Sequence, residues 1–387
     1  MRRNIIKDIL PAKEPLLNTR YRTISVSNPL FKGNELKYVT KCIKTGWVSS
    51  LGGYVEEFEN KFSRYCEARY GISCSSGTTA LHLALASLGI GKDDEVIIPT
   101  FTMISTANAV TYQGAVPVLI DSEENTFNID PEKIEEKITK KTKAIIAVHI
   151  YGHPADMDKI LKISKKYNLY VIEDAAEAHG AEYKGKRAGG LGDVGCFSFY
   201  GNKIITTGEG GMLVTNNRRI KEKAGYLRDL AFSKERHFWH KELGFNYRMS
   251  NLQAAVGLAQ LERIDVLIRI KRNNAKLYDT LLRDIRGIIL PKEENYAKNV
   301  YWMYAILVED SFGISKDELR KRLARRGIET RNFFIPIHLQ PIYFKICKGQ
   351  FPVAEELCKK GLYLPSGFNL KKNEIKFIAK TIREAAR

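Results

Sequence analysis

Seven short apolar runs alternate with segments of helical periodicity through the central part of the chain. The runs are rich in Val, Ile, Phe and Tyr and predict strands at residues 70–74, 95–101, 116–121, 144–151, 169–174, 195–200 and 211–215. Segment 79–88 is apolar almost all round, and segment 156–167 carries apolar residues at helical spacing, so both predict helices. This alternation favours an α/β fold with a mostly parallel, seven-stranded central sheet covered on both faces.

The pattern changes after the seventh run. A long helical pattern begins at about Met249 and becomes basic around Lys271, which predicts a connecting helix. Beyond Pro291 we expect a strand at 301–308, a helix at 316–326, a Pro-containing loop at 333–341 and a terminal helix at 371–387. The predicted organisation is an extension (1–23), a large domain (24–285) and a smaller C-terminal α+β domain (286–387).

Composition and charge narrow the function classes. Of 387 residues 44% are hydrophobic, but no apolar run reaches the about 18 residues of a membrane span and no signal peptide is recognisable, so a cytoplasmic protein is expected. The six cysteines form no CxxC pair, so no metal or redox site is predicted. The net charge is +18, but the lysines are dispersed, which favours a basic surface that attracts an anionic substrate over a nucleic-acid site.

Distinctive polar residues follow two of the predicted strands, where open parallel sheets bind their ligands. After the first strand, Gly77 and Thr78 open a helix whose free amides suit a phosphate, although a plain helix cap is the alternative. After the fifth strand stands Asp174, and a carboxylate that ends a buried strand is costly unless it is paired. A pyridinium nitrogen would be such a partner, and backbone amides are the structural alternative.

Lys203 follows the sixth predicted strand among glycine and hydroxyl residues. In a closed site, burial and nearby cations would lower the pKa of this lysine and make its amine a nucleophile and base. A surface lysine is the alternative, which the neighbouring motifs disfavour.

Together these segments resemble the pyridoxal-phosphate (PLP) dependent sugar aminotransferases of the DegT/DnrJ/EryC1/StrS family. The resemblance begins at about Ile24 and includes residues 47–50, 76–81, 173–180, 198–203 and 244–249. It implies the fold type I (aspartate-aminotransferase-like) architecture, and amino transfer from L-glutamate to a nucleotide-linked keto-sugar. Dehydratase relatives carry His where this chain has Lys203, so amino transfer is favoured over dehydration.

The resemblance also implies the roles of individual residues. Lys203 would bond covalently to PLP and carry protons between cofactor and substrate. Asp174 would pair with the pyridine nitrogen, and the cofactor phosphate would be held by Gly77, Thr78 and Ser198.

Three further positions follow from the resemblance. Asn246 is expected to reach the cofactor phosphate from the neighbouring subunit, which implies a homodimer with shared active sites. Glu177 stands near the ring hydroxyl, where the family often has Gln, and a carboxylate there could alter protonation. Met103 stands where many members stack an aromatic ring on the cofactor, and a thioether can still pack on that face.

Within the family, segments 199–211, 238–240 and 330–341 are most similar to members that convert GDP-4-keto-6-deoxymannose to GDP-perosamine, for a surface polysaccharide such as O-antigen. Candidates for binding the sugar, its diphosphate or the donor carboxylate are Arg236, His237, Trp239, Arg331 and His338. A structural role is the alternative for each of them. A UDP- or dTDP-linked keto-sugar is the alternative substrate, and a PLP-binding relative without turnover is the non-enzymatic alternative.

Overall fold

The computed structural model describes residues 23–386 except 234, 237, 347 and 348. The predicted N-terminal extension therefore lies almost entirely outside the described residues. No helix within the described part of the chain is both long and apolar enough to cross a membrane.

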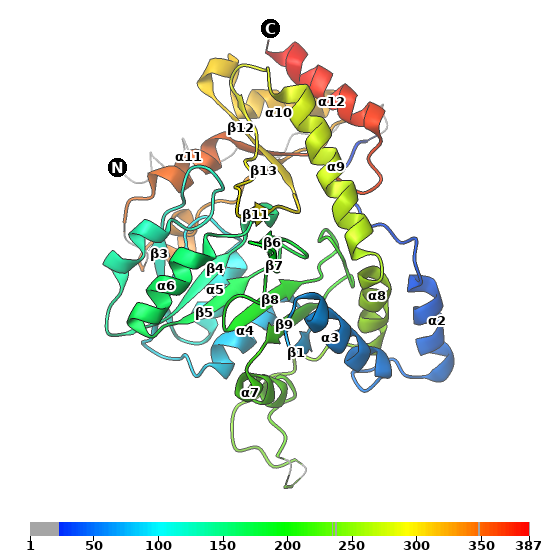
Figure 1. Cartoon of the computed structure of the whole chain (residues 1–387), viewed down its shortest axis with the longest axis vertical. Helices are drawn as coiled ribbons and strands as arrows, with labels where there is room; N and C mark the ends of the chain where they lie inside the picture. The colour runs from blue at the N-terminus through cyan, green and yellow to red at the C-terminus, as the bar shows by residue number, and fades with distance from the viewer. Residues whose placement is uncertain (1–22, 234, 237, 347–348, 387) are drawn as a thin grey trace.

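A seven-stranded sheet forms the centre of the molecule, with strand order β1-β9-β8-β5-β4-β2-β3 (Figure 1). Strands β3, β2, β4, β5 and β8 run parallel to one another, whereas β9 is antiparallel to its neighbours β8 and β1. The predicted mostly parallel sheet is thus confirmed. The strands are β1 (Tyr70–Cys74), β2 (Glu95–Pro99), β3 (Val116–Ile120), β4 (Thr142–Val148), β5 (Tyr170–Asp174), β8 (Val194–Ser198) and β9 (Gly211–Thr215).

Both faces of the sheet are covered, because successive residues of each strand point to opposite sides. Val96 and Ile98 of β2 pack into the large core cluster that contains α4 and α5, whereas Ile97 between them packs into the cluster that contains α6. This two-sided burial explains why the strands are continuous apolar runs. The helices around the sheet are α2 (Glu35–Thr45), α3 (Gly53–Tyr65), α4 (Gly77–Ser87), α5 (Ile104–Tyr112), α6 (Met157–Tyr167) and α7 (Arg218–Arg228).

The predicted connecting helix is two helices, α8 (Asn251–Leu261) and α9 (Ile264–Leu282). The break falls at Glu262, whose carboxylate accepts hydrogen bonds from the side chains of Asn34 and Tyr38. Lys271, in the basic part of this segment, is fully buried in α9.

The C-terminal part has its own antiparallel sheet, with strand order β10-β12-β14-β13. Helices α9, α10 and α12 pack on it around a separate apolar cluster (Figure 1). This arrangement is the α+β organisation expected there, while the domain boundaries stay a prediction. The elements are β10 (Ile288–Ile289), β12 (Tyr304–Val308), α10 (Lys316–Arg325), β13 (Arg331–Asn332), α11 (Pro352–Lys360), β14 (Gly361–Leu364) and α12 (Lys372–Ala385). Three two-residue strands complete the described set, β6 (Glu182–Tyr183), β7 (Lys186–Arg187) and β11 (Ala297–Lys298).

Candidate active site

A cavity of about 310 Å³ opens at the carboxyl ends of β4, β5 and β8. This is the edge of a parallel sheet at which ligands are expected. Seven of the residues predicted from the sequence line it: Gly77, Thr78, Met103, Asp174, Glu177, Ser198 and Lys203. Further lining residues are Ser76, Leu81, Thr102, Ser105, Val148, Ala176, Tyr200, Asn202, Glu209, Trp302 and Phe334.

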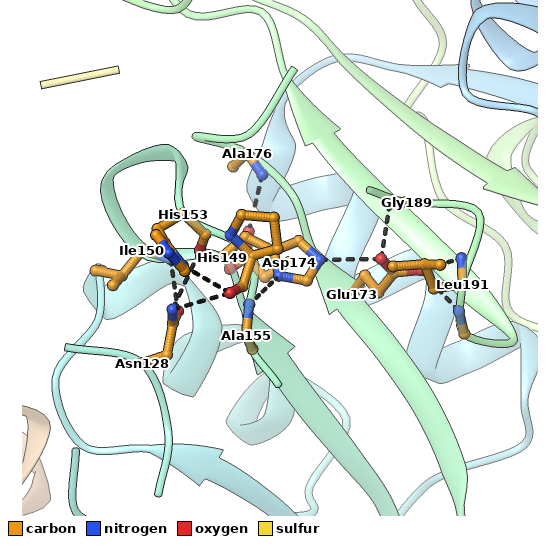
Figure 2. A network of polar contacts seen from close by, with 12 residues as sticks. Asn128, His149, Ile150, His153, Ala155, Glu173, Asp174, Ala176, Gly189 and Leu191 are labelled. Carbon is orange, nitrogen blue, oxygen red and sulfur yellow. Dashed lines mark hydrogen bonds and ion pairs between the residues drawn. The ribbon is translucent and has the colours of Figure 1, made fainter. Parts of the chain in front are cut away.

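Asp174 is the last residue of β5 and points into this cavity. Its Oδ2 accepts a hydrogen bond from Thr106 Oγ1 (2.8 Å), and its Oδ1 accepts one from the Ala176 amide (3.3 Å; Figure 2). Burial raises the pKa of the Asp174 carboxyl above its ordinary value, although both hydrogen bonds act in the opposite direction. A cation at the cavity end of this side chain would therefore be strongly favoured by the carboxylate.

The preceding residue, Glu173, holds the end of β5 in place. Its carboxylate accepts hydrogen bonds from the amides of Gly189, Leu191 and Gly192, each 2.7 Å long, and lies 2.9 Å from His149 Nε2 (Figure 2). His149 Nδ1 accepts from the Ala155 amide (3.1 Å), so the ring proton is on Nε2 and is donated to Glu173. This buried network is structural and fixes the backbone from which Asp174 projects.

Lys203 lies in the turn that follows β8. Its amide donates to Tyr200 O (2.9 Å), and its Nζ lies 4.0 Å from Glu177 Oε1 and 4.0 Å from the centre of the Trp302 ring. Burial lowers the pKa of the Lys203 ammonium, while the carboxylates of Glu177 and Asp174 oppose that effect. A larger share of this amine is therefore neutral, and able to act as nucleophile or base, than in an exposed lysine.

Glu177 is a buried neighbour of Lys203. Its Oε2 accepts a hydrogen bond from the Tyr151 amide (2.8 Å), and Tyr151 has a φ of 54°, in the left-handed region that bulky residues rarely adopt. Burial raises the pKa of the Glu177 carboxyl. Lys203 and Glu177 thus form a buried pair whose proton is easily redistributed.

The beginning of α4 lines the same cavity as Asp174. Ser76 caps the helix by accepting from the Thr79 amide, which leaves the first amides of the helix directed at the cavity. A Cβ on Gly77 would lie 2.6 Å from Ser198 Cβ, so only glycine lets the helix start this close to β8. Such a helix terminus beside a hydroxyl residue is well suited to a phosphate.

Met103 stands at the mouth of the cavity. It is the residue before α5 and its side chain is 48% exposed. A ligand that fills the cavity would cover this thioether, which is consistent with the packing role predicted for it.

Asn246 does not line the cavity of the single chain. Its residue is exposed, in the segment between α7 and α8, and pairs with Asp229 in an isolated β-bridge. The next residue, Tyr247, accepts a hydrogen bond from the Ser75 amide (2.8 Å), so the segment runs beside the start of α4. Its predicted role toward a neighbouring subunit stays a prediction.

None of the predicted substrate-binding residues that the structure describes lines the cavity of the single chain. Arg236 lies with its guanidinium 5.4 Å from the Trp239 ring, on a segment that projects beyond α7 (Figure 1). His237 lies outside the described residues. Arg331 donates two hydrogen bonds to Glu329, and His338 contacts Thr100 and Glu355. Their predicted roles stay untested.

Trp302 and Phe334 line the cavity but are not among the residues singled out in the sequence. Both come from the C-terminal part of the chain, 99 and 131 residues after Lys203. Trp302 precedes a strand in the segment Val-Tyr-Trp-Met-Tyr, where a large apolar residue is unremarkable. No local pattern could have assigned it to the site.

Comparison with known proteins gives consistent matches along the chain. The model of the DegT/DnrJ/EryC1/StrS aminotransferase family matches residues 29–383. The chain is 45% identical over 353 residues to GDP-perosamine synthase of Caulobacter vibrioides, covering 91% of this chain and 95% of that one. It is 44% identical over 362 residues to GDP-perosamine synthase of Escherichia coli O157:H7, covering 93% and 98%.

Solved structures agree with these matches. The crystal structure of DesV from S. venezuelae superposes with a TM-score of 0.87 at 35% sequence identity, covering 92% of this chain and 94% of that one. The predicted fold type I architecture is thereby confirmed.

Proposed function

The chain belongs to the DegT/DnrJ/EryC1/StrS aminotransferase family and uses pyridoxal phosphate, and from this premise we propose that it transfers the amino group of L-glutamate to C4 of GDP-4-keto-6-deoxymannose, giving GDP-perosamine. The observation that carries the substrate proposal is that GDP-perosamine synthases from two organisms match more than nine tenths of the chain at 44–45% identity. The structure contributes a cavity whose residues fit the cofactor.

The fit rests on two features of the cavity. The buried Asp174 carboxylate needs a positive partner, and a protonated pyridine nitrogen is such a group. Gly77, Thr78 and Ser198 line the cavity at the start of α4, where the cofactor phosphate would be held. When bound, pyridoxal phosphate supplies an aldehyde that takes up the amino group and a ring that accepts the electrons released at the substrate carbon.

The remaining chemistry is proton handling by the chain. Lys203 Nζ lines the cavity with its pKa lowered by burial, so it can carry a proton between a substrate carbon and the cofactor. Glu177, 4.0 Å away, stabilises the protonated form of this amine and is held by the Tyr151 amide. The buried surroundings exclude water, which strengthens each of these electrostatic interactions.

The anionic substrates need further cations. Among the described residues that line the cavity, Lys203 is the only Lys or Arg, and it faces Asp174 and Glu177. A nucleotide diphosphate and the carboxylates of glutamate are therefore proposed to be bound by the residues predicted from the sequence, Arg236, His237, Trp239, Arg331 and His338. Arginine suits such groups because its forked donors match two oxygens at once.

We propose a homodimer in which each cavity is completed by the partner. Asn246 is exposed beside the start of α4, where a second copy could present the same residue to the phosphate. Large apolar side chains are also exposed in and after α2, including Leu36 (81%), Ile43 (65%) and Leu51 (80%), as an interface surface would be in an isolated subunit.

Since both substrates are charged and do not cross a bilayer unaided, the cytoplasm is the proposed location.

The experiment that tests the reaction begins with an absorbance spectrum of the purified protein with and without L-glutamate. Glutamate should change the cofactor absorbance, and later addition of a keto-sugar should restore it. GDP-4-keto-6-deoxymannose should be aminated in preference to UDP- and dTDP-linked keto-sugars. Amination of the UDP sugar alone would remove the GDP assignment, and a spectrum insensitive to glutamate would remove amino transfer.

The shared site has a separate test. A mixture of Lys203→Ala and Asn246→Asp subunits, each inactive alone, should regain about one quarter of native activity, because half of the dimers are mixed and carry one intact site of two. No recovery in a mixture shown to exchange subunits would contradict a shared site.

A further inference from the structure

Trp302 stands in a strained turn that precedes β12. Its neighbour Tyr301 has a φ of 49°, and the Tyr301 amide donates to Asn299 Oδ1 (2.7 Å). A bulky residue in the left-handed region costs free energy, and such strain collects at functional sites where the surroundings impose it. The side chain that this turn places at the cavity is that of Trp302.

The turn is fixed by contacts on two sides. The Val300 amide donates to Gly152 O (3.2 Å), and a Cβ on Gly152 (φ 101°) would lie 3.0 Å from the Trp302 nitrogen. From α9, the buried Lys271 Nζ donates to Trp302 O (2.9 Å). The backbone of Trp302 therefore has little freedom to move.

The Trp302 side chain meets the Lys203 segment twice. Its indole Nε1 donates a hydrogen bond to Asn202 O (2.8 Å), the peptide that leads into Lys203. Its ring face lies 4.0 Å from Lys203 Nζ, inside the range in which an ammonium is attracted to an indole. One side chain thus contacts both the backbone and the amine of this lysine.

Carboxylates face the same amine from other elements. Glu177 lies 4.0 Å from Lys203 Nζ. The carboxylate of Asp174, at the end of β5, also raises the pKa of Lys203. The charge of Lys203 in turn adds to the effect of burial in lowering the pKa of the nearby His179 ring. Without the indole, the ammonium would be free to settle between Glu177 and Asp174. With the indole in place, its ring face 4.0 Å from Lys203 Nζ also attracts the ammonium.

We propose that Trp302 is the positioning residue for Lys203, with its indole N–H fixing the lysine peptide and its ring face holding the ε-ammonium whenever that amine is not bonded to the cofactor. The inference rests on the proposed role of Lys203 as the residue that bonds the cofactor. It gives Lys203 a defined position within reach of the cavity during the part of each transfer in which its amine is free.

The test measures Lys203 itself in the full-length, cofactor-free protein. Competitive acetylation across a pH series from about 6 to 11, read by peptide mass spectrometry with the exposed Lys140 as internal reference, reports the protonation of Lys203. Loss of the ring face in Trp302→Leu should move the Lys203 profile to lower pH by about 0.5 to 1 unit. Trp302→Phe, which keeps a ring face, should recover most of that shift.

The second contact has its own readout. Trp302→Phe lacks the indole N–H, so hydrogen exchange of the amides around Asn202 and Lys203 should quicken in this variant as well as in Trp302→Leu. If Trp302→Leu does not fold, Trp302→Phe alone decides. Faster exchange of the Asn202 and Lys203 amides in Trp302→Phe, with a small shift of the Lys203 profile, supports the proposal. Native exchange together with a native Lys203 profile in Trp302→Phe overturns it.

Phe333→Leu is the matched control, since Phe333 is buried in the adjoining aromatic cluster 5.0 Å from the Tyr151 ring and does not line the cavity. It should leave the Lys203 profile native. An equal shift in this control, or none in a folded Trp302→Leu, overturns the proposal. Failure of the proposed function would appear elsewhere, as absence of a borohydride-fixed pyridoxyl group on Lys203 in the native protein.

Discussion

Glu173 and Asp174 are consecutive residues of β5 whose carboxylates serve opposite sides of the strand. Glu173 is fully buried and bonded to His149 and three backbone amides (Figure 2). Asp174 faces the cavity and accepts hydrogen bonds from Thr106 and the Ala176 amide. The alternation of side chains along a strand places a structural acid and a cofactor-facing acid next to one another. Substitutions of Asp174 should therefore lower turnover, whereas substitutions of Glu173 should lower the stability of the fold.

Asp174→Asn should abolish most turnover without unfolding the protein. The amide keeps the shape of the side chain but cannot balance a buried positive charge, whose loss of a partner costs about 3 kcal/mol. Turnover should drop by about two orders of magnitude. Steady-state kinetics measures this, with Glu173→Gln as the comparison, which should lower the thermal unfolding temperature more than Asp174→Asn does. Equal activity in Asp174→Asn and native protein would refute the pairing role.

Lys203→Ala should prevent covalent attachment of the cofactor. Native protein treated with pyridoxal phosphate and borohydride should carry a pyridoxyl group on the peptide containing Lys203, because the buried amine is partly neutral and reactive. The variant should carry none there and should be inactive. Mass spectrometry of digested protein decides the matter, and a tag on a different lysine of native protein would contradict the assignment.

Glu177→Gln should change the pH at which Lys203 titrates. The carboxylate 4.0 Å away raises the pKa of Lys203 against the effect of burial, so a neutral amide should let the amine lose its proton at lower pH. Competitive acetylation of cofactor-free protein should show the Lys203 profile displaced to lower pH. The Gln side chain can still accept the Tyr151 amide hydrogen bond, so the fold should be retained, and an unchanged profile would mean that the pair is not coupled.

Gly77→Ala should weaken cofactor binding. The added Cβ would meet Ser198 Cβ at 2.6 Å and push the start of α4 away from β8, which moves the amides predicted to hold the phosphate. A clear rise in the Kd for pyridoxal phosphate is expected by titration of the cofactor-free protein. Gly225→Ala in α7, where a Cβ meets nothing within 4 Å, is the control and should bind normally.

Lys271 should make the stability of the protein depend on pH above neutrality. Burial lowers its pKa to about 7 in the folded chain, whereas the unfolded chain keeps an ordinary lysine. Between about pH 7 and 10 the unfolded chain therefore binds more protons, so this residue opposes folding most at low pH and less as the pH rises through that window. Urea unfolding of native and Lys271→Met protein should show a difference in free energy of unfolding that changes in favour of the native protein with rising pH. A difference that is constant across that window would contradict the lowered pKa.

The sequence by itself determined the central sheet and one half of the active site. Apolar runs between chain-breaking residues mark strands wherever they occur, and the carboxyl ends of parallel strands meet at one edge, so Gly77, Asp174 and Lys203 could be placed together before any coordinates. The apolar runs are local in the chain, and the meeting of the strand ends at one edge follows from the sheet topology alone.

Only the tertiary structure decided which distant side chains complete that edge. Trp302 reaches Asn202 across 100 residues of sequence, and Lys271, basic and inconspicuous in a helical segment, is buried beneath it. Hydrophobic periodicity reports whether a residue faces a core, but it does not report which element lies across from it. The partners of Lys203 therefore depend on how the C-terminal part packs against the sheet, a property that no short stretch of the chain contains.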